Sequence, residues 1–139
     1  MVILSVDYGD ARTGVAVCDK NEILASPVCT LKEKDRQALA EKIVEICNEK
    51  KAQMIVIGLP RNMDGTYGYR CDECRALADE IQSIQNLDVQ FEDERLTTVM
   101  AHNFLNTTDT RGKKRKAVVD TVSAVLILES YINKRNNSR

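Results

Sequence analysis

The chain has 139 residues, of which 43% are hydrophobic, enough for the core of one domain, so we expect a single domain over residues 1–139. Its formal net charge of −1 gives no overall electrostatic reason to bind a polyanion. No apolar run approaches the roughly 20 residues that cross a bilayer, and five cysteines without a secretion signal favour reduced thiols, so we expect no membrane association and a cytoplasmic location.

Three strand-like runs open the chain, at Val2–Val6, Thr13–Cys18 and Ile23–Leu31, and the turn-rich segments DYGDARTG and DKNE separate them. Such short connections predict an antiparallel meander. Residues 35–50 then repeat apolar side chains at helical spacing, and Met54–Leu59 is a continuous apolar run typical of a strand buried on both faces.

The second half of the chain alternates in the same way. Arg70–Gln85 is predicted as a helix and Val89–Asp93 as the last strand. A short helix is expected over Val99–Leu105, a mobile polar loop over residues 107–116, and a final helix from Ala117 to about Tyr131. The prediction is an α/β fold with a mixed five-stranded sheet, in which two parallel strands extend the meander in the order 3-2-1-4-5 and helices flank the sheet.

Asp7 is the first candidate for chemistry. It continues the alternation of Ile3 and Ser5 to the end of the first strand, where Gly9 allows a turn, so its carboxylate can face a cleft. An aspartate at this place can equally serve an Asx turn. Asp7 alone does not decide between the two.

Asp120 is the second candidate, because it interrupts the apolar pattern of the final helix. An unpaired carboxylate among apolar side chains would cost several kcal/mol, on the order of the desolvation of a charge, so it needs a partner. That partner could be a metal ion or Lys116, four residues earlier. The sequence leaves both open.

The third candidate lies in FEDERLTT. Alternation puts Asp93 on the side of Val89 and Phe91 and puts Glu94 on the other side, so alternation alone favours Asp93 as the inward carboxylate. A turn or bulge at the end of the strand would re-aim Glu94 instead. Three carboxylates of this kind suit Mg²⁺ or Mn²⁺, which take oxygen ligands and leave positions for water and phosphate.

Charge is unevenly distributed along the chain. Residues 111–139 contain eight Lys and Arg against two acids, a balance of +6, whereas residues 1–110 contain twelve against nineteen, a balance of −7. A basic segment beside acidic residues fits a site that holds metal and phosphate, although a solvated helix gives the same count. Cys71 and Cys74 lack a second pair of ligands, so a zinc site is not favoured.

Four segments, DYGDARTGVAV, VIGLPRNMDGT, DERLTT and KAVVDTVSAVLIL, together resemble the YqgF family of Holliday junction resolvase-like proteins and pre-16S rRNA nucleases. The segments follow the family order and span nearly the whole chain. The resemblance implies a ribonuclease H-like fold similar to that of the RuvC resolvase. It also implies a nuclease that depends on Mg²⁺ or Mn²⁺.

The same resemblance implies roles for individual residues. Asp7, Glu94 and Asp120 would be the catalytic metal ligands, with Glu94 preferred to Asp93 by the RuvC-like pattern. Contacts to substrate phosphates would come from four basic residues, Arg12, Arg95, Lys113 and Lys116. RuvC-type enzymes carry a further acid where this chain has Ser123, which implies weaker metal occupancy or a single persistent ion.

Nucleic acid is thus the expected partner, and three functions compete for it. The first is hydrolysis of phosphodiester bonds in structured RNA, above all maturation of pre-16S rRNA during ribosome biogenesis. The second is cleavage of branched DNA by a Holliday junction resolvase, and the third is a non-catalytic nucleic-acid-binding module. The sequence does not choose between RNA and DNA, or between a monomer and a homodimer.

Overall fold

The computed structural model describes residues 1–9, 11–59, 69–93 and 112–137. The predicted meander consists of β1 (Ile3–Tyr8), β2 (Thr13–Cys18) and β3 (Ala25–Leu31). The middle strand, β2, pairs antiparallel with both β1 and β3. The first strand extends two residues further than predicted, so Asp7 lies within β1 and pairs with Gly14.

The turn between β2 and β3 differs from the prediction, which began the third strand at Ile23. Asp19 Oδ1 accepts hydrogen bonds from the backbone N–H groups of Ile23 (2.8 Å) and Leu24 (2.9 Å), and Glu22 has a φ of 56°. These bonds hold the chain in a turn, because they occupy the amides that a strand would need. Ile23 and Leu24 are consequently 78% and 65% exposed.

Two crossovers complete the sheet. Asp35 caps α1 (Arg36–Glu49) by accepting a hydrogen bond from Ala38 N, and the helix leads to β4 (Met54–Leu59), which is buried throughout and pairs parallel to β1. Next, α2 (Tyr69–Ile84) leads to β5 (Asp88–Asp93), which pairs parallel to β4. The strand order β3-β2-β1-β4-β5 confirms the prediction.

The final helix is longer than predicted. The helix α4 spans Gly112–Asn137, so residues 112–116, expected in a loop, are its first turns. Their Lys and Arg side chains are good helix formers, although they have no apolar pattern that would indicate a helix. The short helix expected over Val99–Leu105 lies outside the described residues.

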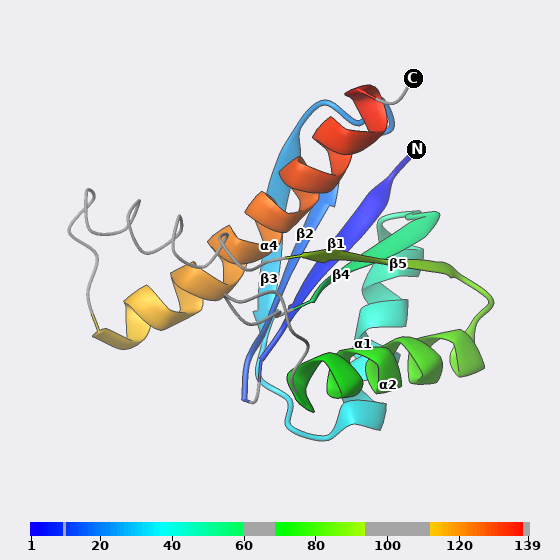
Figure 1. Ribbon diagram of the computed structural model, residues 1–139. Coiled ribbons are helices and arrows are strands. Elements are labelled where there is room, and N and C mark those ends of the chain that lie inside the picture. Colours follow the sequence, from blue (N-terminus) through cyan, green and yellow to red (C-terminus); the bar gives the residue numbers. More distant parts are fainter. Residues whose placement is uncertain (10, 60–68, 94–111, 138–139) are drawn as a thin grey trace.

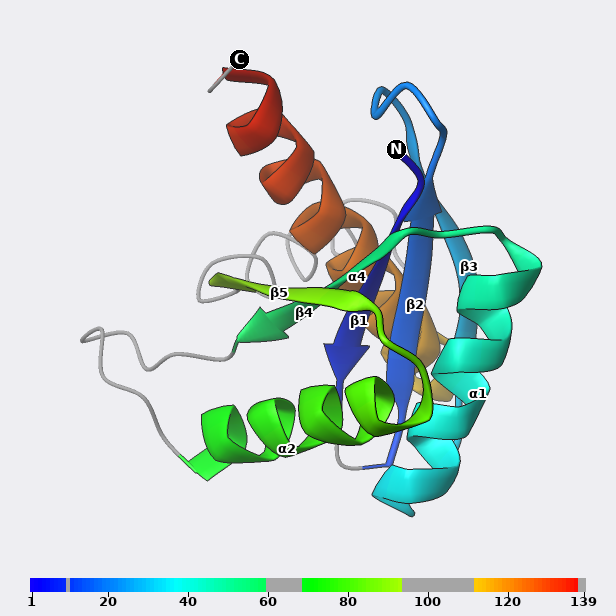
Figure 2. The same cartoon turned by 90° about the vertical axis from the view of Figure 1, so that its right-hand side faces the viewer.

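Helices cover both faces of the sheet, α1 and α2 on one and α4 on the other (Figures 1 and 2). Alternate residues of β1 divide between the two cores: Leu4 and Val6 pack with α1 and α2, while Ile3 packs with Ala124 and Leu128 of α4. Cys71 and Cys74 are fully buried in the α1–α2 core, where they act as small apolar side chains. No helix within the described ranges is long and apolar enough to span a membrane.

Candidate functional site

Asp7 lies near the carboxyl end of β1, on the face of the sheet that α4 covers. The strand alternates through Ile3, which packs with α4, and Ser5, whose Oγ donates a 2.7 Å hydrogen bond to the carbonyl of Ala124. Asp7 is the next residue in this row, and its side chain is half-buried. Because Asp7 pairs with Gly14 within the ladder, the strand alternation of Ile3 and Ser5 extends as far as this residue.

The direction of α4 brings Asp120 to the same region. The helix runs antiparallel to β1, because its C-terminal end lies beside the start of the chain (Figure 1). Asp7 lies two residues beyond Ser5 toward the carboxyl end of β1, about 6.6 Å along the strand. The backbone of Asp120 lies one turn before Ala124, about 6 Å along the helix in the same direction. The Ser5–Ala124 bond therefore aligns the two backbone positions.

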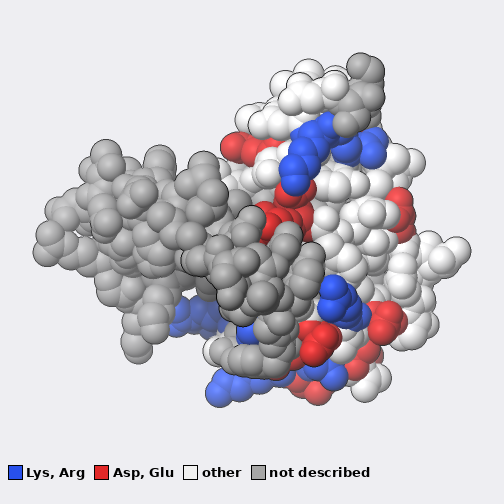
Figure 3. Space-filling model, in the orientation of Figure 1, with Lys and Arg blue, Asp and Glu red and all other residues white. Residues whose placement is uncertain are grey.

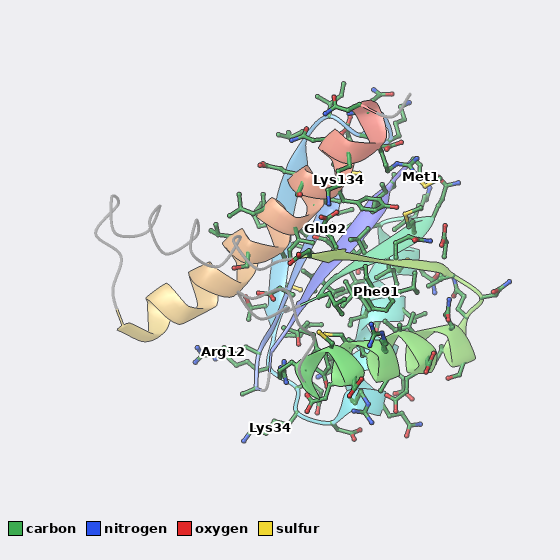
Figure 4. The ribbon with its side chains drawn as sticks, in the orientation of Figure 1. Met1, Arg12, Lys34, Phe91, Glu92 and Lys134 are labelled. Carbon is green, nitrogen blue, oxygen red and sulfur yellow. The ribbon has the colours of Figure 1, made fainter. Side chains whose placement is uncertain are left out.

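The two faces of β5 bear on the choice between Asp93 and Glu94. Val89 packs against the α1–α2 core, whereas Glu92 is buried and forms an ion pair with Lys134 of α4 (Figure 4). Alternation thus puts Asp93 on the α1–α2 face, opposite to the face that carries Asp7. The sequence favoured Asp93 as the inward carboxylate, but its side of the strand faces the α1–α2 core and not α4. Both faces of this sheet are buried, so a side chain that points inward can belong to either core. Glu94 itself lies outside the described residues.

A buried hydroxyl lies on α4 three residues after Asp120. Ser123 is fully buried, and its Oγ has no hydrogen-bond partner among the residues that the structure describes. A buried polar atom without a partner is costly and often indicates a bound water or ion. The observation fits a polar ligand beside this part of α4. Among the described side chains, no group of three His, Cys, Asp or Glu is placed to hold a metal ion.

The opposite face holds the end of β1 in place through Arg70, at the start of α2. Its Nη2 donates a 2.7 Å hydrogen bond to the carbonyl of Tyr8, its Nη1 pairs with Glu73 at 2.6 Å, and its guanidinium lies 5.3 Å from the centroid of the Tyr8 ring. Burial raises the pKa of Tyr8, and the neighbouring Arg36 opposes that shift. Arg70 was not predicted as a site residue, since nothing in the sequence connects it with a residue 62 positions away.

The turn after β1 sets the position of Arg12. A Cβ at Gly9 would lie 2.3 Å from the carbonyl oxygen of Arg12, so only glycine permits this close approach. Arg12 is half-buried and directly precedes β2. Of the other predicted phosphate contacts, Lys113 and Lys116 lie in the first turns of α4, where only their backbone is described, and Arg95 lies outside the described residues.

Comparison with known proteins assigns a family to this arrangement. Residues 1–134 match the family model described as RuvX: Holliday junction resolvase. The chain belongs to the RuvX family. Because the match covers nearly the whole chain, it includes β1, the segment around Glu94 and the part of α4 that carries Asp120.

Curated RuvX-like relatives have the same extent. A protein of Ruminiclostridium cellulolyticum named "Putative pre-16S rRNA nuclease" is 41% identical over 135 residues, which cover 96% of this chain and 95% of that protein. A protein of the same name from Protochlamydia amoebophila is 39% identical and covers 96% of this chain and 93% of its own length. The similarity extends over whole chains.

Solved structures confirm the predicted fold. The Thermus thermophilus RuvC structure superposes with a TM-score of 0.59 at 11% identity and covers 99% of this chain and 97% of its own. The fowlpox virus Holliday junction resolvase gives a TM-score of 0.55 at 11% identity, with 96% and 99% covered. This RuvX chain therefore has the RuvC-like ribonuclease H fold.

Proposed function

We propose that this RuvX protein is a nuclease that hydrolyses phosphodiester bonds in structured nucleic acid and that pre-16S rRNA is its substrate. The observation that carries the proposal is the alignment of Asp7 with Asp120 through the Ser5–Ala124 hydrogen bond. It supports a common site for two aspartates from opposite ends of the chain, because it aligns their backbone positions. The names of the curated relatives support the choice of pre-16S rRNA.

Asp7, Glu94 and Asp120 would hold the divalent cation, Mg²⁺ or Mn²⁺. Their oxygen donors suit these hard cations, and the unpaired hydroxyl of Ser123 supports a polar environment beside Asp120. The chemistry supplied by such a cation would be the activation of water and the stabilisation of the leaving oxygen. Glu92 of β5 faces α4, so alternation places Asp93 on the opposite face from Asp7, and this supports Glu94 over Asp93 as the ligand.

The protein's own groups would bind and orient the nucleic acid. Arg12 offers a guanidinium that can bind a phosphate through two hydrogen bonds, and Arg95 would do the same beyond β5. Lys113 and Lys116 come from the first two turns of α4, just before Asp120. They would bind phosphates as point charges, whereas the sheet keeps Asp7 in a fixed position.

Cleavage of branched DNA is the second candidate, because the matching family model is described as a Holliday junction resolvase. A junction has two-fold symmetry, so a resolvase would act as a symmetric dimer. Measurement of the molecular mass in solution, alone and with a four-way junction, separates this case from an RNA nuclease that acts as a monomer.

The decisive experiment incubates the purified protein with labelled pre-16S rRNA and with a four-way DNA junction, in Mn²⁺, Mg²⁺ or EDTA. We expect metal-dependent cleavage of the RNA that Asp7→Asn and Asp120→Asn abolish, while Asp79→Asn, an exposed aspartate of α2, leaves it unchanged. Titration with Mn²⁺ followed by electron paramagnetic resonance should show weaker binding in the first two variants alone. Binding of nucleic acid without cleavage under every condition would instead indicate a non-catalytic module.

A further inference from the structure

Several described Lys and Arg side chains form ion pairs with acids, and three at the carboxyl end of β1 do not. The described pairs are Lys42–Glu33, Arg36–Glu80, Arg70–Glu73, Arg75–Asp72, Lys134–Glu92 and Arg135–Glu22. In the part of the chain that the structure describes, Arg12, Lys32 and Lys34 have no such partner. Cations at this end of the sheet that pair with no described acid can bind a ligand near Asp7.

The sheet register brings these cations to the Asp7 side. Thr13 of β2 pairs with Tyr8 of β1 and with Leu31 of β3, so the next residues, Arg12 and Lys32, follow side by side. Leu31 packs in the α1–α2 core, and alternation therefore places Lys32 on the opposite face, the face of α4. Arg12 and Lys34 both project outward from this end of the sheet (Figure 4).

The neighbouring acids contact other groups. Glu33 pairs with Lys42 at 3.0 Å, and the hydrogen bond from Lys42 lowers the pKa of its carboxyl group. Asp35 is the N-cap of α1, where its Oδ2 accepts a 3.1 Å hydrogen bond from Ala38 N. Each carboxylate already has another partner, and neither forms an ion pair with Lys32 or Lys34 among the described residues. The space-filling view shows Lys and Arg side chains, with Asp and Glu side chains beside them, along the lower edge of the molecule (Figure 3).

We propose that Arg12, Lys32 and Lys34 form a phosphate-binding track. This track holds the nucleic-acid strand on the β3 side of the cleaved bond. The inference rests on the proposed nuclease function. Lys32 lies two residues and two strands from Asp7, or about 12 Å at standard strand spacings. At this distance the track engages phosphates beyond the one at the bond that is cut.

Salt-dependent binding tests the track. The probe is a labelled pre-16S rRNA end fragment, bound to full-length protein carrying Asp7→Asn so that cleavage does not interfere. Lys32→Gln/Lys34→Gln is compared with Lys20→Gln/Lys50→Gln, two exposed lysines without described ion pairs at the opposite end of the sheet. Thermal unfolding of each variant verifies that the fold is retained.

Each lost phosphate contact removes about 0.7 to 0.9 from the slope of log K against log salt, and weakens binding about five- to eightfold at 0.1 M salt. The Lys32→Gln/Lys34→Gln variant should therefore lose about 1.4 to 1.8 of the slope. The Lys20→Gln/Lys50→Gln control should keep the slope of the parent. If Lys32→Gln/Lys34→Gln and the control gave the same slope, the two lysines would not bind phosphates and the track would be refuted. The nuclease proposal would be unaffected. If the parent protein bound no RNA and the wild type did not cleave it, the proposed function would fail with it.

Discussion

Replacement of Ser5 by alanine tests whether one hydrogen bond positions α4 for activity. Ser5 is fully buried, and its Oγ bonds the Ala124 carbonyl, 119 residues away, at 2.7 Å. The helical carbonyl keeps its place in the backbone pattern of α4, so the variant strands no buried acceptor. A buried hydrogen bond of this kind contributes about 1 kcal/mol, which for a chain of this size corresponds to a fall in Tm of about 3–5 °C.

The loss of activity should be larger than the loss of stability suggests. Asp120 lies one turn from Ala124, and a displacement of about 1 Å in a reacting group can lower a rate about 100-fold. We expect Ser5→Ala to cleave pre-16S rRNA at least about tenfold more slowly than wild type under conditions where both remain folded.

Ser83→Ala is the matched control. Ser83 Oγ donates to the Glu80 carbonyl at 2.7 Å as well, but on the exposed surface of α2 and within one helical turn. Its loss should change the free energy of unfolding by less than about 0.5 kcal/mol and leave the rate unchanged. Calorimetry and single-turnover cleavage measure both effects. If Ser5→Ala lost stability like a buried bond yet cleaved at the wild-type rate, the position of α4 would not depend on this contact.

Three further outcomes can be measured by unfolding or titration. Lys134→Met should lower the free energy of unfolding by about 1–3 kcal/mol, because Glu92 stays buried without its ion-pair partner. Adding Glu92→Leu to this variant should recover most of the loss, as measured by denaturant unfolding. If the double variant recovered none of it, the buried carboxylate would not be the cause. Thr13→Val should raise the free energy of unfolding by about 1 kcal/mol, because Thr13 Oγ1 is buried and has no hydrogen-bond partner within the described ranges. A destabilised variant would show that the hydroxyl is satisfied in solution. Asp19 should titrate by NMR below its ordinary pKa of 3.8, because the backbone N–H groups of residues 24 and 23 stabilise its charged form. Its contribution to stability is present above the ordinary pKa and is lost as the pH falls through the lowered pKa. A titration midpoint at or above 3.8 would refute the turn geometry.

Local patterns predicted the elements wherever burial follows a simple period. Met54–Leu59 was predicted with the bounds that β4 has, because a strand buried on both faces is apolar throughout. Ile23 and Leu24 were wrongly included in the third strand, because the pattern of apolar residues does not reveal that Asp19 holds their amides in a turn. The first turns of α4 were missed for the opposite reason: Lys and Arg favour helices without producing an apolar period.

The candidate site was predictable in part. Strand alternation followed by a glycine turn identified Asp7, and an interrupted apolar pattern identified Asp120. Alternation could not show which core each face of β5 meets, so it could not choose between Asp93 and Glu94. The contacts that align the site, Ser5–Ala124 and Arg70–Tyr8, join residues 119 and 62 positions apart, and no local pattern contains them.

The length of α4 has a mechanical consequence. Lys134 forms an ion pair with Glu92 of β5, and Arg135 forms one with Glu22 in the turn between β2 and β3. These two contacts fix the C-terminal end of the helix. At about 1.5 Å per residue, Asp120 lies about 21 Å from Lys134 along the same rod. A tilt of only about 3° at the anchor would then displace position 120 by about 1 Å. Substitutions at the far end of the molecule should therefore alter catalysis without touching the substrate, and amide hydrogen exchange should become faster along α4 from its anchored end toward its start.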